Sequence, residues 1–291
     1  MTLREVFSSI ANAIRSKTGK TETIKPVDMA TEIESIQTNK LAKLVDNTIK
    51  TITAEDLAGA TRVRDSAFSN CSSLTQITIP DSVTIIGFNT FSNCSSLTSI
   101  TLPDSVTSIP SSTFYNCSSL TSINIPNSVT SIDSSAFYQC RSLTSITLPE
   151  GIIKIGSQVF YGCSSLTQIT IPAKVTTIGS SAFSQCSSLT SINIPDSVTS
   201  IDASTFYSCS SLTQITIPAN VTSINHRALQ IGSSTNKATI TMKPTTPPTI
   251  NPYAFDASTL NKIIVPVGCG DAYKNATNWS NFADYIEEAT E

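Results

Sequence analysis

The chain has 291 residues, of which only 13% are charged, and its formal net charge is -3 at pH 7. This balance provides no basic field that would collect nucleic-acid phosphates or anionic lipid headgroups, so we expect no nucleic-acid partner. No stretch reaches the ~18 to 20 continuous apolar residues that a transmembrane helix requires, so we expect no membrane insertion.

The first 40 residues have a helical pattern. Apolar residues at positions 3, 6, 7, 10 and 14 form one helical stripe, which Gly19 ends as glycine commonly ends helices. Pro26 is a typical first residue of a second short helix, whose apolar stripe follows at positions 29, 33 and 36. We therefore predict a helical hairpin over residues 1–40, which serves for attachment or as an N-terminal cap.

Polar residues exclude a secretion signal at this end. Glu5, Ser8 and Ser9 interrupt the apolar core that such a signal would need, so we expect no signal peptide. Residues 41–65 are predicted to be a linker and a degenerate first repeat.

Residues 66–231 repeat with a period of 23 residues, which the cysteines mark most clearly. Seven of the eight cysteines follow one another at this spacing, namely Cys71, Cys94, Cys117, Cys140, Cys163, Cys186 and Cys209. Within one unit, Leu74, Ile77 and Ile79 have the Leu-x-x-Leu-x-Leu spacing, whose last two positions point to the same side of a strand. The unit therefore contains a strand.

Proline limits that strand. Pro80 and its equivalents have no N–H to donate to a ladder, so the strand is predicted to be about five residues long. A second apolar pair, Val83 and Ile86, recurs in later units and predicts a second, outer strand or extended segment.

One unit cannot bury its apolar face alone, but stacked copies pair strand with strand at roughly 4.7 to 4.9 Å and share a continuous core. We therefore predict a β-rich leucine-rich-repeat solenoid of seven units with parallel strands over residues 66–231. Its interior is expected to hold one phenylalanine column, Phe68, Phe91, Phe114, Phe137, Phe160, Phe183 and Phe206. A leucine column is expected beside it, Leu74, Leu97, Leu120, Leu143, Leu166, Leu189 and Leu212.

The unit resembles that of the BspA-like leucine-rich-repeat family of bacterial surface and phage-borne proteins, which reads Ala-Phe-x-x-Cys-x-x-Leu-x-x-Ile-x-Ile-Pro. The stretch from Ala136 to Pro149 matches this pattern in order and spacing, with Phe137, Cys140 and Leu143 in their places. The pattern recurs in degenerate form over residues 232–268. The resemblance implies a non-catalytic binding or structural protein.

A solenoid has two exposed ends that need caps. At the C-terminal end, Tyr273, Trp279, Phe282 and Ile286 fall on a helix-like spacing, so residues 269–291 are predicted to be a helical cap.

The N-terminal segment carries a second resemblance. The motif from Ala13 to Gly19, followed by Ile24-Lys25-Pro26, is similar to the start of tail-associated proteins in prophages of Gram-positive gut bacteria. This resemblance implies that residues 1–40 attach to other virion proteins. A helical cap on the first rung is the alternative, and the two roles are compatible.

Two interpretations of the cysteine column remain open. Neighbouring rungs would bring the cysteine Cα atoms within bridging range, as in a secreted disulfide-rich protein. Alternatively, the thiols are small buried hydrophobes, which the parallel direction of side chains in register and the odd number of repeats favour. The Cys-x-x-Cys spacing of zinc sites is absent from the sequence.

No arrangement of residues predicts catalysis, a metal site or a cofactor. The single histidine, His226, lies in a variable unit and is expected at the surface. Asp81 and Asp104 would lie one rung apart, but their row continues with Asn127, Glu150 and an alanine, so a calcium column is not expected.

The candidate binding residues occupy the outward positions of the strands. They are Gln76, Thr78, Ser99, Thr101, Ser122, Asn124, Ser145, Thr147, Gln168, Thr170, Ser191 and Asn193, and the last unit adds Gln214 and Thr216. These side chains would form a flat polar face able to hydrogen-bond sugars or the backbone of a partner. Any soluble sheet also needs polar residues at such positions, so the pattern alone does not separate binding from solubility.

A tyrosine stripe is the second candidate surface. Tyr115, Tyr138, Tyr161 and Tyr207 each follow a residue of the phenylalanine column, and Ser184 interrupts them. Such rings would stack on sugars, fill a protein interface or pack against the neighbouring turn.

These observations leave three functions open. The first is a phage or prophage tail-associated protein that recognises a glycan or protein on the host surface, located in the virion and outside the cell after lysis. The second is a bacterial surface adhesin, and the third is an interaction scaffold in the cytoplasm. We do not expect an enzyme.

Overall fold

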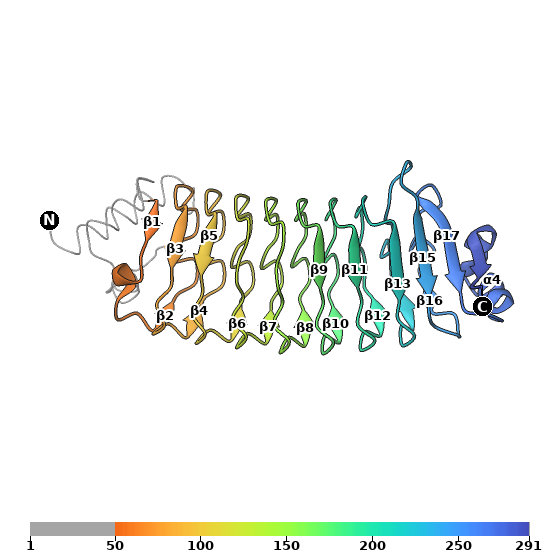
Figure 1. Cartoon of the computed structure of the whole chain (residues 1–291), viewed down its shortest axis with the longest axis horizontal. Coiled ribbons are helices and arrows are strands. Elements are labelled where there is room, and N and C mark those ends of the chain that lie inside the picture. The colour runs from red at the N-terminus through yellow and green to blue at the C-terminus, as the bar shows by residue number, and fades with distance from the viewer. Residues whose placement is uncertain (1–49, 291) are drawn as a thin grey trace, which may run out of the picture.

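The computed structural model describes residues 50–290, which form a parallel β-solenoid with its turns following one another along the long axis (Figure 1). The predicted fold class is confirmed, with about ten turns at a spacing of ~23 residues. The helices predicted for residues 1–40 lie outside the described residues. Within residues 50–290, no helix is both long and apolar enough to cross a membrane.

One row of strands carries the main ladder along the solenoid (Figure 1). Its members are β1 (Thr51–Ile52), β3 (Gln76–Thr78), β5 (Ser99–Thr101), β9 (Gln168–Thr170), β11 (Ser191–Asn193), β13 (Gln214–Ile217), β15 (Ala238–Met242), β17 (Leu260–Val265) and β18 (Ile286–Glu288). Equivalent residues pair in parallel, as Gln76 does with Ser99 and Ile77 with Ile100. An isolated bridge between Asn124 and Thr147 continues the row through the central rungs.

The second apolar pair of each unit forms an outer row of strands, so the predicted second strand is confirmed. Each has two residues: β2 (Arg62–Val63), β4 (Ile85–Ile86), β6 (Ser108–Ile109), β7 (Ser131–Ile132), β8 (Lys154–Ile155), β10 (Thr177–Ile178), β12 (Ser200–Ile201), β14 (Ser223–Ile224) and β16 (Thr249–Ile250). A short 3-10 helix, η1 (Glu55–Leu57), lies between β1 and β2.

The prediction of five-residue main strands was wrong for the regular units. β3, β5, β9 and β11 have three residues each. The chain turns on both sides of the ladder, because the Leu74 N–H donates to the Cys71 carbonyl at 3.0 Å and the Val83 N–H donates to the Pro80 carbonyl at 3.0 Å. Only the central residues between these turns remain extended enough to pair.

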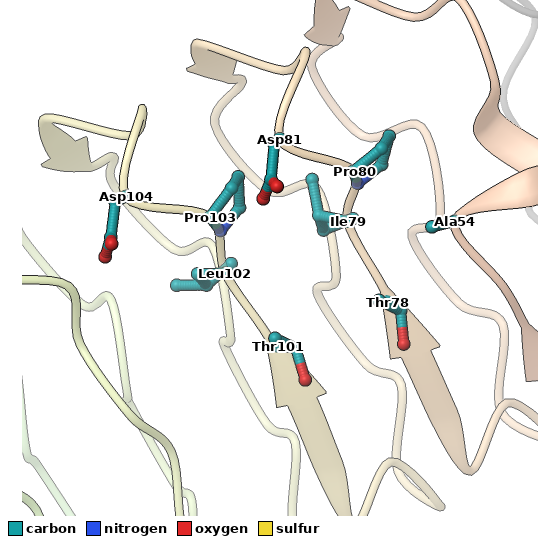
Figure 2. A pocket seen from close by; sticks show the side chains of 9 residues that line it. All are labelled: Ala54, Thr78, Ile79, Pro80, Asp81, Thr101, Leu102, Pro103 and Asp104. Atoms are coloured by element: carbon teal, nitrogen blue, oxygen red, sulfur yellow. The ribbon is translucent and has the colours of Figure 1, made fainter.

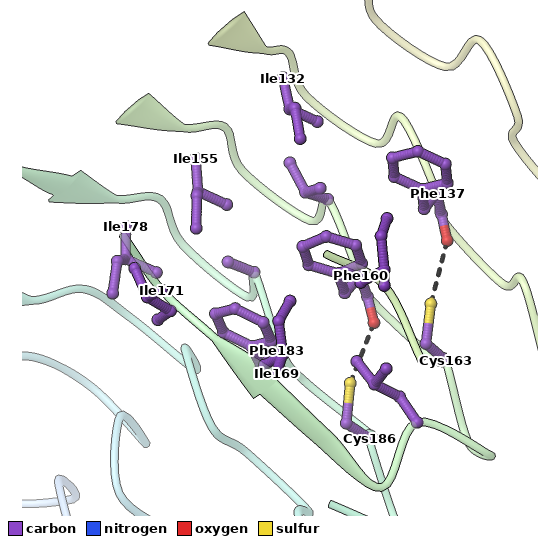
Figure 3. Packing of buried hydrophobic residues seen from close by; sticks show 14 of the residues in the cluster. Ile132, Phe137, Ile155, Phe160, Cys163, Ile169, Ile171, Ile178, Phe183 and Cys186 are labelled. Atoms are coloured by element: carbon purple, nitrogen blue, oxygen red, sulfur yellow. Dashed lines mark hydrogen bonds between the residues drawn. The ribbon is translucent and has the colours of Figure 1, made fainter. Parts of the chain in front are cut away.

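The core is a set of columns that run through the rungs (Figure 3). Rings of the phenylalanine column stack face to face, with centroids between 5.2 and 5.7 Å apart from Phe68 to Phe206. The leucine column from Leu74 to Leu212 is fully buried. Both predicted columns are therefore confirmed, and each rung buries the apolar face of the next.

Left-handed backbone conformations hold each phenylalanine inward. The residues two positions before and two positions after the ring have positive φ, as Asn89 (54°) and Asn93 (61°) do around Phe91. Asparagine tolerates this conformation better than most residues, and these positions carry Asn, Ser, Gln or Gly throughout the regular units. The tight arc also aligns the backbone, so that the Phe91 N–H donates to the Thr113 carbonyl at 2.9 Å.

The cysteines of the described chain are all free thiols, and six of them are buried. Each buried sulfur donates to the phenylalanine carbonyl of the preceding rung, as Cys163 Sγ does to Phe137 at 3.2 Å and Cys186 Sγ to Phe160 at 3.1 Å (Figure 3). The structure therefore agrees with the buried-thiol interpretation and not with disulfides. The thiols link neighbouring rungs through hydrogen bonds.

Burial also changes the acidity of these thiols. It raises the pKa of Cys117, Cys163 and Cys209 to about 12, and that of the less buried Cys71 to about 11. Because a thiolate in this apolar column would lose its hydration, the native state keeps the thiols protonated.

The C-terminal end closes the solenoid with two short helices and a strand. α4 (Gly270–Asn275) and the 3-10 helix η2 (Trp279–Tyr285) precede β18, which pairs in parallel with β17. The Trp279 indole is fully buried and donates to the Pro248 carbonyl at 2.7 Å, so this ring plugs the end of the core.

The prediction of a wholly helical cap was only partly right. Ile286, predicted to lie on a helix, belongs to β18. The positive φ of Asn278, 67°, breaks the helical path between α4 and η2. After η2 the chain pairs as β18 with β17, whose edge would be unpaired without it. Glu288 fastens the turn, since its carboxylate accepts the backbone N–H groups of Gly268 at 3.0 Å and Gly270 at 2.8 Å.

The raised thiol pKa values predict alkaline instability. In the unfolded chain a thiol ionises near pH ~8.5, whereas the buried thiols stay protonated, so the free energy of unfolding should fall as the pH rises above that value. Each buried thiol should lower it by about 1.4 kcal/mol one pH unit above the unfolded pKa. Urea unfolding of the full chain between pH 7 and 10, with a reductant present, measures this slope.

The control is Cys140→Ala, which removes one buried thiol. The free energy of unfolding should then fall less steeply with pH, by the contribution of one ionising group. Thiol counting gives a second readout: the denatured chain should react at all eight cysteines. A stability independent of pH across this range, or a lower count without added reductant, would contradict the buried thiol column.

Candidate binding surface

The outward side chains of the main strands form a polar face in register. All the residues predicted for this face are exposed except Thr78, which is half-buried. Their equivalents lie directly over one another on successive rungs, as Ser191 does over Gln168 and Asn193 over Thr170. The isoleucines between them point inward to the core. The sequence thus placed these residues on one face correctly.

The side chains of this polar face have unused hydrogen-bonding groups. Within residues 50–290, none of these hydroxyls and amides takes part in a hydrogen bond with the rest of the chain. The neighbouring threonine row differs, because Thr98 and Thr121 each donate a hydroxyl to the threonine carbonyl one rung before, at 3.0 and 3.4 Å. The threonine row therefore stabilises the stacking through hydrogen bonds, to which the side chains of the polar face do not contribute.

A hollow of about 480 Å³ lies at one end of the polar face (Figure 2). Thr78 and Thr101 of the face line it, together with the rings of Pro80 and Pro103. The Asp81 and Asp104 carboxylates extend from equivalent turns of neighbouring rungs at its edge (Figure 2).

Sequence reasoning missed this hollow. From the first rung it is lined by Ala54, a small residue that directly precedes η1. Only the alanine and the irregular spacing before Cys71 could have indicated it.

The tyrosine stripe is a stack of rings over three rungs. The Tyr115 and Tyr138 centroids lie 4.6 Å apart and those of Tyr138 and Tyr161 lie 4.7 Å apart, with interplanar angles of 3° and 5°. Both faces of Tyr138 are therefore covered by tyrosines, so a ligand can reach only its edge and hydroxyl. Free ring faces exist only at the ends of the stack.

Tyr207 stands apart from this stack because Ser184 occupies the rung between. The Arg227 guanidinium lies 5.5 Å from the centre of the Tyr207 ring, a contact that the repeat pattern does not predict. Burial raises the pKa of Tyr161, and the nearby Tyr138 and Tyr207 hydroxyls raise it further, so the Tyr161 hydroxyl stays protonated at neutral pH.

His226 is exposed, with its ring 5.7 Å from Tyr253 and Nδ1 at 3.4 Å from Asn251 Oδ1. Between residues 50 and 290, no group of three or more His, Cys, Asp or Glu side chains could hold a metal ion.

Parallel rungs in register, with apolar columns inside and an outward polar row, define a leucine-rich-repeat solenoid. The chain belongs to the BspA-type leucine-rich-repeat family, whose region model matches residues 61–186 and 153–282 in six copies. Proteins of this family are generally non-catalytic binding proteins.

Solved structures of leucine-rich-repeat proteins resemble the chain. One from T. pallidum is 30% identical and aligns over 57% of this chain and 69% of its own, with a TM-score of 0.41. One from Bacteroides ovatus is 20% identical over 84% of this chain and 85% of its own, with a TM-score of 0.44. The pneumococcal vaccine antigen PcpA is 18% identical over 84% and 76%, with a TM-score of 0.45. No curated protein matches the chain.

The stacking of the tyrosines predicts unequal costs of substitution. Each stacked aromatic pair contributes about 0.5–1.5 kcal/mol beyond its burial, so Tyr138→Ala, which removes two pairs, should destabilise the protein by about 1 kcal/mol more than Tyr115→Ala, which removes one. Urea unfolding measures the difference. Phe88→Ala is the control, because this ring is 51% exposed and pairs with no other ring of the described residues, so its removal should change the free energy of unfolding by less than about 0.5 kcal/mol. Equal costs at positions 115 and 138 would show that the rings do not stack in solution.

Proposed function

We propose that this protein binds a glycan or protein on a cell surface through the polar face of its solenoid. The observation that carries the proposal is the row of exposed hydroxyls and amides that make no hydrogen bond within the described chain. Because equivalent positions pair in register on successive rungs, these groups form one continuous surface along the solenoid.

The chemistry of the face favours uncharged, hydrogen-bonding ligands. Hydroxyls both donate and accept, and side-chain amides offer two donors and an acceptor, which suits sugar hydroxyls and peptide groups. No charged side chain belongs to the fourteen positions that make up this face. A polysaccharide or an extended protein segment lying along the solenoid axis would meet the same groups on each rung.

We further propose that the protein is a phage or prophage tail component that carries this face to a host cell. The support is the similarity of the segment around Ala13 to Gly19 to prophage tail-associated proteins, which gives residues 1–40 the role of binding other virion proteins. The protein would then act in the virion, and outside the cell after lysis. A bacterial surface adhesin and a cytoplasmic interaction scaffold are the alternatives from the same family.

Added charge on the polar face should abolish binding. The double variant Ser145→Lys and Ser191→Lys places cations on two exposed face positions, whereas Ile85→Lys and Thr177→Lys does the same on the outer row. Pull-down of the full chain with bacterial cell walls, or a glycan array where the ligand is a glycan, should show binding by wild type and by the outer-row variant and a loss of binding by the face variant. Equal binding by both variants would place the ligand elsewhere, provided that circular dichroism shows intact folding.

The tail role makes a separate prediction about the genome. Genes for a tail tape-measure protein, a baseplate or lysis proteins should lie beside the gene for this chain. A locus without any such gene would contradict the tail role and would leave the binding role of the polar face intact.

A further inference from the structure

The tyrosine stripe is interrupted within an otherwise regular part of the solenoid. The position after each buried phenylalanine carries tyrosine at 115, 138 and 161, then Ser184, then Tyr207. The three preceding rings form a continuous stack with centroids 4.6 and 4.7 Å apart. At Ser184 one ring of this stack is missing, although the rungs on both sides keep theirs.

Two ring faces border this interruption. One face of Tyr161 is covered by Tyr138, and the other is turned toward the rung of Ser184. Tyr207 is covered by Arg227, which lies 5.5 Å from the ring centre and belongs to the following rung, so its uncovered face is turned toward Ser184 as well. Two rungs at roughly 4.7 Å each separate the rings by about 9 Å. The distance from a ring inserted midway to each tyrosine would be about the distance from Tyr138 to Tyr115 and to Tyr161.

Ser184 forms the base of this interval. Ser184 is 1% exposed, and its hydroxyl donates a hydrogen bond to the Tyr207 carbonyl at 3.4 Å. Ser92 holds the equivalent position with only one tyrosine beside it, at Tyr115, and is still only 7% exposed. The equivalent Ser69, with no tyrosine on a neighbouring rung, is half-buried, so exposure at this position falls as tyrosines are added and the Tyr161 and Tyr207 rings cover Ser184. A ligand ring would therefore lie between the outer parts of the two tyrosine rings and not against Ser184.

The residues around the interval are polar and uncharged. Gln158 and Gln185 are exposed beside it, and Ser181 is half-buried. An aromatic anchor of a protein partner is stabilised best where the surrounding contacts are apolar and desolvated, which is not the case here. A pyranose ring has two apolar C–H faces that pack on aromatic rings and a rim of hydroxyls that bond amides and hydroxyls.

We propose that the interval above Ser184 binds one sugar ring of the glycan, held between the faces of Tyr161 and Tyr207. The site rests on the proposed glycan-binding function and gives it an anchoring point. The stacked sugar would fix the position of the glycan along the solenoid.

The test is to supply the missing ring. Ser184→Tyr should complete the tyrosine stack, fold normally and block the site. Ser92→Tyr is the matched control, because it also adds one tyrosine to the stack, at the end next to Tyr115 and away from the site. The probes are an array of bacterial cell-wall and surface saccharides and then calorimetric titration with the saccharide that the full wild-type chain binds best.

We expect Ser184→Tyr to bind this saccharide about ten- to a hundredfold more weakly, as the loss of two ring contacts implies, and Ser92→Tyr to bind it as wild type does. Tyr207→Leu, which removes one face of the site, should also weaken binding and serves if Ser184→Tyr fails to fold. Wild-type affinity in both Ser184→Tyr and Tyr207→Leu would overturn the site and leave glycan binding by the polar face standing. A wild-type chain that binds no saccharide but captures a surface protein would overturn the sugar site alone, and a chain that binds neither would overturn the proposed function as well.

Discussion

No rung of this solenoid can bury its own apolar side chains, so each one depends on an equivalent rung stacked on it in register. Phe114 has a phenylalanine on both sides, and its carbonyl accepts the thiol of Cys140 at 3.2 Å from the following rung. A register shift of one residue would move every such pair out of contact and turn apolar residues outward. The 23-residue period of the regular units keeps these pairs in register, while irregular rungs stay in register at other spacings, as Gln214 pairs with Thr239.

The same requirement separates the residues that fold the protein from those that are free to bind. The inward positions must be nearly identical on every rung, because each side chain packs on its own equivalent. Outward positions have no such partner, and there Gln76, Ser99 and Ser122 vary without cost to the core. A binding surface on this fold can therefore change while the columns beneath it stay constant.

Sequence alone was sufficient for the parts of the molecule that repeat. The period, the Phe and Leu columns, the outer strands and the outward position of residues such as Thr101 and Asn124 all follow from apolar spacing. The cysteine column could be read in two ways, because spacing places side chains but does not show that each sulfur has a carbonyl to bond.

Prediction was less successful where the repeat changes. The three-residue strands depend on how tightly the chain turns at Leu74 and Val83, and the strand at Ile286 depends on an edge left by β17, neither of which is a local property of the sequence. The hollow beside Ala54 and the contact of Arg227 with Tyr207 arise between irregular rungs, where no repeat pattern exists to extrapolate. The interval at Ser184 was visible as a break in the stripe, but the two ring faces around it emerge only from the stack.

We propose that the ligand binds the outward face of the main strands. Hydrogen exchange of the full chain, measured by mass spectrometry with and without solubilised bacterial cell-wall fragments, tests it most directly, because a ligand on this face should slow local opening of the rungs that it spans. The predicted result is slower exchange in peptides containing β5, β9 and β11, with little change in those containing the outer strands β6, β8 and β10. Protection confined to the outer strands, or to neither row, would contradict the claim.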